Sequence, residues 1–160
     1  MKANIKLAFA ISALFVFGNI SGQNCSGIQN SMLCDIPAPN VSEFKYSSFS
    51  RSALVETKIP YKYSATLPPG KDYLIGVCCD SRFRPVKFRI IDLVKDSVIY
   101  DNSTDDYVEN IGFTVEQNPM NLIIEVTVMA NDVKPRFVDD KRCCVGIRIL
   151  YRTIGKKGFY

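Results

Sequence analysis

The chain has 160 residues, with no histidine, no tryptophan and a formal net charge of only +4. Without histidine there is no Ser-His-Asp triad, no His metal ligand and no general base of the usual kind near neutral pH. The small net charge is also unlike the concentrated basic charge of a nucleic-acid-binding protein. We therefore expect neither a His-based enzyme nor a nucleic-acid partner.

Residues 1–22 predict a cleavable signal peptide. Lys2 and Lys6 form a basic start, the apolar stretch 7–17 follows, and Gly22 is one of several small residues near its end. This order is typical of a secretory signal. The apolar stretch is 11 residues long, whereas a membrane-spanning helix needs about 20. We expect export to the periplasm, the cell surface or the outside of the cell, with no membrane span after cleavage.

Residues 23–43 form an irregular, cysteine-containing leader in our prediction. Asn, Ser, Gly and Pro dominate this stretch, and these residues favour turns over regular structure. Cys25 and Cys34 both lie in it, and we expect them to close a short disulfide loop.

Residues 44–152 predict an all-β domain. Apolar and polar residues alternate with a period of two, which is typical of strands with one buried face. We expect an antiparallel β-sandwich of jelly-roll-like type, with about eight strands and disulfide support. The basic and aromatic tail 153–160 is expected to fray. The alternating or apolar runs are 44–48, 53–58, 61–65, 72–79, 86–93, 97–100, 111–115, 122–129 and 143–151.

Four further cysteines stand in two adjacent pairs, Cys78 with Cys79 and Cys143 with Cys144. Adjacent residues of a strand point to opposite faces. We therefore expect Cys79 and Cys143 inside the core, where they could bond to each other, while Cys78 and Cys144 could bond outside it. Adjacent cysteines lack the spacing of a zinc site, and no Cys-x-x-Cys redox motif occurs. An even number of cysteines in an exported chain instead predicts disulfides.

Three segments carry a family resemblance: Lys71-Asp72-Tyr73-Leu74-Ile75, Phe88-Arg89-Ile90-Ile91-Asp92 and Val98-Ile99-Tyr100-Asp101-Asn102. With them, residues 61–151 resemble small exported β-sandwich proteins of Bacteroidetes-type bacteria. They are more loosely similar to the sandwich modules that accompany secreted peptidases and to Golgi-dynamics (GOLD-type) domains. The resemblance implies a sandwich and export, and it implies no catalytic or ligand residue.

The acidic stretch 101–109 is the one candidate metal site. Asp101, Asp105 and Asp106 lie close together in the sequence, and Ca²⁺ prefers several oxygen ligands of this kind. The ordered spacing and central glycine of a calcium-binding hand are absent. The alternative is a polar turn, in which Asp, Asn and Ser are favoured for backbone reasons.

Charge is divided unevenly along the chain. Residues 96–132 carry eight acidic groups and no basic group, while residues 133–160 carry eight basic groups and two acidic groups. Two interpretations stay open. Acidic and basic strands could lie side by side and neutralise each other, or the chain could present a surface of two signs for docking.

The leading functional hypothesis is an exported, non-catalytic binding or structural module, with a protein or another envelope component as partner. An inhibitor of a secreted hydrolase is a variant of it. A calcium-assisted carbohydrate-binding module is the second hypothesis; otherwise no cofactor is expected. A hydrolase with a carboxylate pair, such as Asp105 and Asp106 or Asp139 and Asp140, is the third.

Overall fold

The computed structural model describes residues 25–131 and 141–155. The predicted signal peptide, the pair Asp139 and Asp140, and the residues 156–160 lie outside these ranges. The described residues confirm the all-β prediction, with nine antiparallel strands in two sheets. The strands are β1 (Lys45–Tyr46), β2 (Arg51–Glu56), β3 (Tyr61–Leu67), β4 (Lys71–Cys79), β5 (Val86–Asp92), β6 (Ser97–Asp101), β7 (Asn110–Val115), β8 (Met120–Val128) and β9 (Arg142–Thr153).

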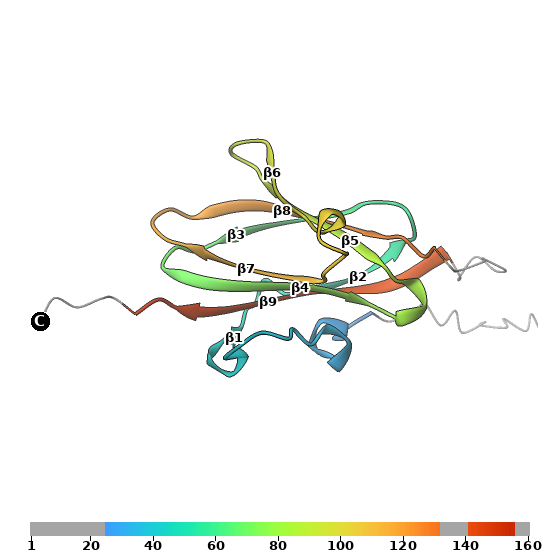
Figure 1. Cartoon of the computed structure of the whole chain (residues 1–160), viewed down its shortest axis with the longest axis horizontal. Helices are drawn as coiled ribbons and strands as arrows, with labels where there is room; N and C mark the ends of the chain where they lie inside the picture. The colour runs from blue at the N-terminus through green and yellow to red at the C-terminus, as the bar shows by residue number, and fades with distance from the viewer. Residues whose placement is uncertain (1–24, 132–140, 156–160) are drawn as a thin grey trace, which may run out of the picture.

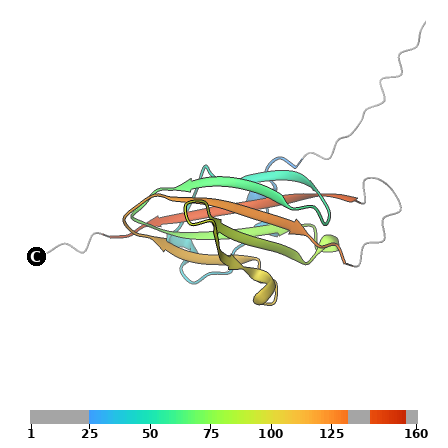
Figure 2. The same ribbon diagram turned by 90° about the horizontal axis from the view of Figure 1, so that it is seen from above.

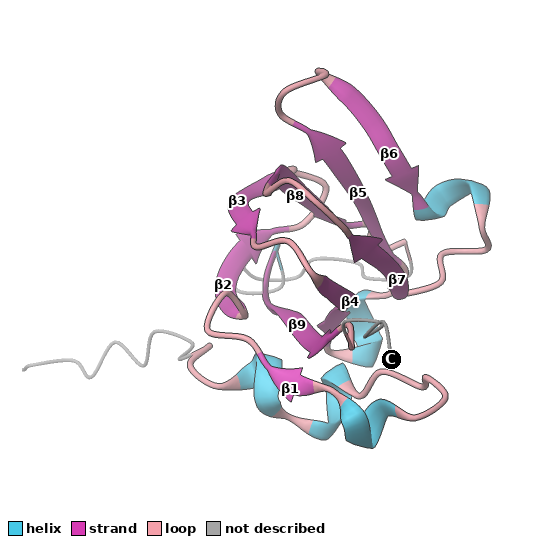
Figure 3. Ribbon diagram, turned by 90° about the vertical axis from the view of Figure 1, so that its left-hand side faces the viewer, coloured by secondary structure: helices cyan, strands magenta, loops and turns pink. Residues whose placement is uncertain are grey.

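The two sheets pack face to face (Figures 1 and 2). Sheet A has the order β1-β9-β4-β7, and β2 pairs with the same strand β9 that β1 pairs with. Sheet B has the order β3-β8-β5-β6. The chain changes sheet at most connections, so strands that are neighbours in a sheet are mostly distant in the sequence. Strands β6 and β7, joined by one loop, therefore form edges of two different sheets (Figure 3).

The core lies between the sheets and follows the predicted alternation. In β5, Val86, Phe88 and Ile90 are almost completely buried, while Lys87 and Arg89 lie on the outer face. Aliphatic side chains of β4, β8 and β9 complete the core. Because β-branched and aromatic side chains pack well on a pleated surface, these runs form strands.

The leader lies on the outer face of sheet A. It forms three short 3-10 helices, η1 (Ile28–Asn30), η2 (Met32–Cys34) and η3 (Val41–Glu43). Two more such turns, η4 (Ser81–Phe83) and η5 (Asn102–Thr104), lie within the sandwich connections. No helix in the described ranges is long and apolar enough to cross a membrane.

Two disulfides bind the leader to the sheet, and they correct the predicted pairing. Cys25 bonds to Cys144 and Cys34 bonds to Cys78. The expected Cys25–Cys34 loop and the expected Cys78–Cys144 bridge are therefore both wrong. The physical reason is that the leader covers the outer face of β4 and β9. Its two cysteines therefore lie next to Cys78 of β4 and Cys144 of β9, whose side chains point to that face.

The other member of each adjacent pair faces inward, as the alternation predicted. Cys79 and Cys143 lie buried in the core and are free thiols in this structure, so the predicted bond between them is not formed. The Cys79 thiol donates a hydrogen bond to the carbonyl of Asp80 (3.2 Å) and lies beside the Cys143 side chain. The interaction with the Cys143 side chain and burial raise the pKa of Cys79.

Candidate functional site

The β5–β6 hairpin carries an exposed aliphatic surface. Figures 1 and 3 show this hairpin rising out of sheet B, with β6 well separated from β7. Its exposed side chains, here called the hairpin patch, are Leu93, Val94, Val98 and Ile99, and Val94 at the tip is 78% exposed. Apolar side chains that gather on one projecting element are a feature of protein-interaction sites.

The tip of the hairpin is held in one conformation by Asp92. This side chain is buried, and its carboxylate accepts hydrogen bonds from the backbone N–H groups of Val94 (2.8 Å) and Lys95 (3.1 Å). The N–H of Leu93 donates to the carbonyl of Asn121 on the neighbouring strand β8 (2.9 Å). The exposed aliphatic side chains therefore stand on a backbone that is already ordered.

Asn102 anchors the other end of β6, and the sequence analysis missed this role. Its side chain is completely buried. It accepts a hydrogen bond from the N–H of Phe88 (2.8 Å) and donates to the carbonyls of Val86 (2.9 Å) and Val108 (3.1 Å). The Asn102 amide thus makes the hydrogen bonds at the start of β5 that a neighbouring strand would otherwise make. An Asn at the end of a strand is common in turns, so its sequence context gave no specific signal.

The structure does not bring the three predicted calcium ligands together. Asp101 accepts hydrogen bonds from the N–H and hydroxyl of Ser103 and pairs with Lys87 (3.4 Å). Asp105 accepts a hydrogen bond from Tyr100, and Asp106 lines a neighbouring pocket. No group of three or more His, Cys, Asp or Glu side chains within the described ranges could hold a metal ion. Calcium binding stays a prediction without structural support.

Tyr100 connects β6 to both the core and the acidic turn. Its ring packs against Phe88 with 5.3 Å between ring centroids, and its hydroxyl donates to Asp105 (3.0 Å). Burial and this hydrogen bond raise the pKa of Tyr100 to about 12. The hydroxyl therefore stays protonated at physiological pH and fixes the turn that follows β6.

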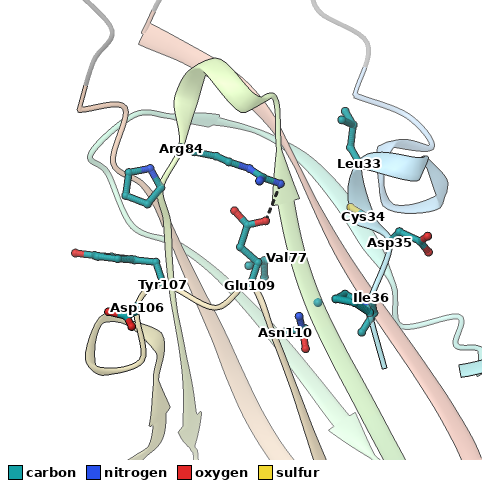
Figure 4. Close-up of a pocket in the computed structure, with 13 residues that line it drawn as sticks. Leu33, Cys34, Asp35, Ile36, Val77, Arg84, Asp106, Tyr107, Glu109 and Asn110 are labelled. Atoms are coloured by element: carbon teal, nitrogen blue, oxygen red, sulfur yellow. Dashed lines mark ion pairs between the residues drawn. The ribbon is translucent and has the colours of Figure 1, made fainter. Parts of the chain in front are cut away.

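A pocket of about 460 Å³ lies beside this turn, between the leader and the loop from β6 to β7. Figure 4 shows Leu33, Asp35 and Ile36 of the leader on one side and Asp106 and Tyr107 on the other. Because the leader forms one wall, the two disulfides that hold it also define the pocket.

An ion pair lines the pocket. Arg84 and Glu109 are 2.9 Å apart, and Figure 4 shows them pointing toward each other. Burial raises the pKa of Glu109, while the nearby Arg84 acts in the opposite direction. A carboxyl group with a perturbed pKa in a pocket is one sign of a functional site, although structural ion pairs perturb pKa values as well.

Basic side chains form ion pairs with only some of the carboxylates in the acidic segment 96–132. Arg89 and Lys62 pair with the buried Glu125 across strands, as the neutralisation hypothesis predicted. By contrast, no cation within the described ranges forms an ion pair with Asp96, Asp105 or Asp106. These three carboxylates flank β6, so the hairpin patch has an acidic border.

The fold and site define a disulfide-stabilised, two-sheet antiparallel protein with a projecting hairpin. No family model and no curated protein matches the chain. Among solved structures it is similar to PliG of Aeromonas hydrophila, a periplasmic lysozyme inhibitor of g-type lysozyme. The sequence identity is 10%, the TM-score is 0.44, and the match covers 64% of this chain and 84% of that chain. A likeness this distant carries no functional argument, and it does not test the resemblance to Bacteroidetes-type or GOLD-type proteins.

Proposed function

We propose that this chain is an exported, non-catalytic binding module that docks a protein partner through the β5–β6 hairpin. The observation that carries the proposal is the hairpin patch: four exposed aliphatic side chains on a projecting element whose backbone is fixed at both ends. A rigid loop loses little conformational freedom on binding, so more of its contact energy contributes to affinity.

Export is supported by the cysteines. Two disulfides join the leader to the sheet, and such bonds persist mainly in oxidising compartments. Together with the expected signal peptide at residues 1–22, they favour the periplasm, the cell surface or the extracellular space as the place where the partner is met.

The test is a cross-linking capture from the envelope and secreted fractions of the host, with the oxidised full chain as bait. The variant Val94→Lys/Val98→Lys alters the hairpin patch, and Ile59→Lys is the matched control because Ile59 is 55% exposed in the β2–β3 turn. We expect one protein to be captured by wild type and by the control variant but lost from the hairpin variant. Equal capture by all three would contradict the proposal.

The identity of the captured protein decides between forms of the same function. If it is a secreted hydrolase, its activity in the presence of this protein shows whether the module is an inhibitor. If it is a structural envelope protein without activity, the module serves in attachment or assembly.

A hydrolase that uses a carboxylate pair is the second candidate. The observation in its favour is that Asp106 and Glu109 line one pocket and that burial raises the pKa of Glu109. Such enzymes need one carboxyl group that is protonated at the working pH. Release of reducing sugar from host polysaccharide, abolished by Glu109→Gln, would support this candidate. No release by the wild-type protein would remove it.

A further inference from the structure

The outer edge of β6 is open. Among the described residues β6 pairs only with β5, so its second row of backbone N–H and C=O groups has no strand partner. Val98 and Ile99, both in this strand, are about half exposed. An exposed edge strand with apolar side chains is a template on which another chain can add a strand.

Side-chain hydrogen bonds fix the backbone at both ends of the open edge. The Asp92 side chain fixes the turn before β6, and the Asn102 side chain fixes the turn after it. A register shift between Ile90 and Ile91 places an extra residue in β6, which changes the local twist of the strand. Since the strand is ordered before any partner arrives, the entropic cost of pairing falls mainly on the incoming segment.

The charges around the edge select the partner. Residues 93–108 contain Lys95 as the one basic group against Asp96, Asp101, Asp105 and Asp106. Lys95 already pairs with Asp92 at 4.0 Å. An antiparallel second copy would place Asp96 of one chain beside the acidic turn of the other, and like charges facing each other across strands are destabilising. A basic segment gains attraction at both ends instead.

We propose that β6 is a strand-addition site that takes an extended, basic segment of the partner protein. This inference rests on the proposed function and names its mode of recognition. Backbone groups of the segment pair with the open edge of β6, its apolar side chains pack on Val98 and Ile99, and its Lys or Arg side chains lie near Asp96, Asp105 and Asp106. Main-chain hydrogen bonds supply affinity in this mode, and the side chains supply selectivity.

The test uses three short, end-blocked peptides and backbone amide NMR spectra of the full oxidised chain. The first peptide alternates Val and Lys, the second alternates Val and Glu, and the third is the first with N-methyl groups on alternate amides. N-methylation removes hydrogen-bond donors and keeps the side chains and charge. We expect the first peptide to shift the amide signals of residues 97–101 and to bind about tenfold more tightly than the methylated one, as the loss of two hydrogen bonds implies. The acidic peptide should not bind.

A pair of variants checks the charge argument. Asp105→Asn/Asp106→Asn should weaken binding of the Val-Lys peptide several-fold, whereas Glu116→Gln, an exposed acidic residue outside the hairpin, should not. Equal binding by the methylated peptide, shifts confined to other strands, or no binding of the Val-Lys peptide would overturn strand addition. A dimer whose interface includes residues 97–101 would also overturn it, in favour of a second copy.

The two proposals can fail separately. If the hairpin variant Val94→Lys/Val98→Lys loses its captured partner while the peptide experiment fails, the hairpin is a docking site that uses side chains alone. If the hairpin variant retains all partners, the proposed function itself fails, whatever the peptides do.

Discussion

The side-chain oxygen of Asn102 lies 2.8 Å from the backbone nitrogen of Phe88 and accepts its hydrogen. One buried amide thereby ties the turn after β6 to β5, the first strand of the hairpin. Through this contact, the exposed edge of β6 depends on a side chain inside the protein. A substitution at the buried Asn102 can therefore test how stable the candidate docking surface is without changing any of its exposed side chains.

Replacing Asn102 by Ala should destabilise the protein by about 1–3 kcal/mol, because the N–H of Phe88 and the carbonyl of Val86 lose their partner in the interior. Urea unfolding measures the change, and faster amide hydrogen exchange at residues 97–101 should accompany it. Asn121→Ala is the control, since the side chain of Asn121 makes an exposed hydrogen bond to Thr66. An equal loss of stability in both variants would contradict the anchoring role.

Replacing Gly146 by Ala should cost about 1–3 kcal/mol, the usual range for overpacking. A Cβ atom at this position would lie 2.5 Å from the sulfur of Cys34, 2.7 Å from that of Cys78 and 3.0 Å from the Cα of Gln29. The leader can approach sheet A closely only because no side chain is present there. Gly155→Ala is the matched control, since nothing lies within 4 Å of its added Cβ. Thermal or urea unfolding compares the two, and equal stability would contradict the close approach.

Cys79 and Cys143 should resist alkylation in the native protein and react after unfolding. Both are buried free thiols, and the interaction with the Cys143 side chain and burial raise the pKa of Cys79. Only the thiolate is nucleophilic. Mass spectrometry after N-ethylmaleimide treatment without reductant should show no label in the native state and two labels after denaturation. No label after denaturation would show that the two sulfurs are bonded to each other.

The phenol of Tyr100 should make stability fall at high pH. Its pKa is about 12 in the folded protein, against an ordinary tyrosine value of 10.0, so the unfolded chain releases this proton first. The stabilisation is complete below about pH 10 and is lost as the pH rises toward about 12. Tyr100→Phe should remove this part of the pH dependence. Unfolding measured between about pH 8 and 12 compares the two proteins, and parallel curves would contradict the assignment.

Glu109→Gln should gain stability relative to wild type as the pH rises from about 4 to 7. Burial raises the pKa of Glu109 above its ordinary value, so its favourable contribution is present below the unfolded-state pKa and lost as the pH rises through the folded-state pKa. Gln does not titrate and escapes this loss. Glu116→Gln serves as the exposed control. A stability difference that does not change with pH would show that Arg84 cancels the effect of burial.

The sequence by itself determined the strands and their faces. Alternation placed Val86, Phe88 and Ile90 in the core and pointed Cys79 and Cys143 inward, because side-chain direction in a strand follows from the local backbone. The class of fold followed from the same local pattern. What these local rules could not give is the distance between strands that are far apart in the chain.

Tertiary structure alone decided the disulfide pairing, the pocket and the open edge. Cys34 and Cys78 are 44 residues apart, and Cys25 and Cys144 are 119 apart, so neither pairing can be deduced from spacing. The role of Asn102 likewise depends on β5 lying beside the turn. These features arise from the register of strands and from the layer in which each segment packs, and both are set by long-range contacts that no local pattern encodes.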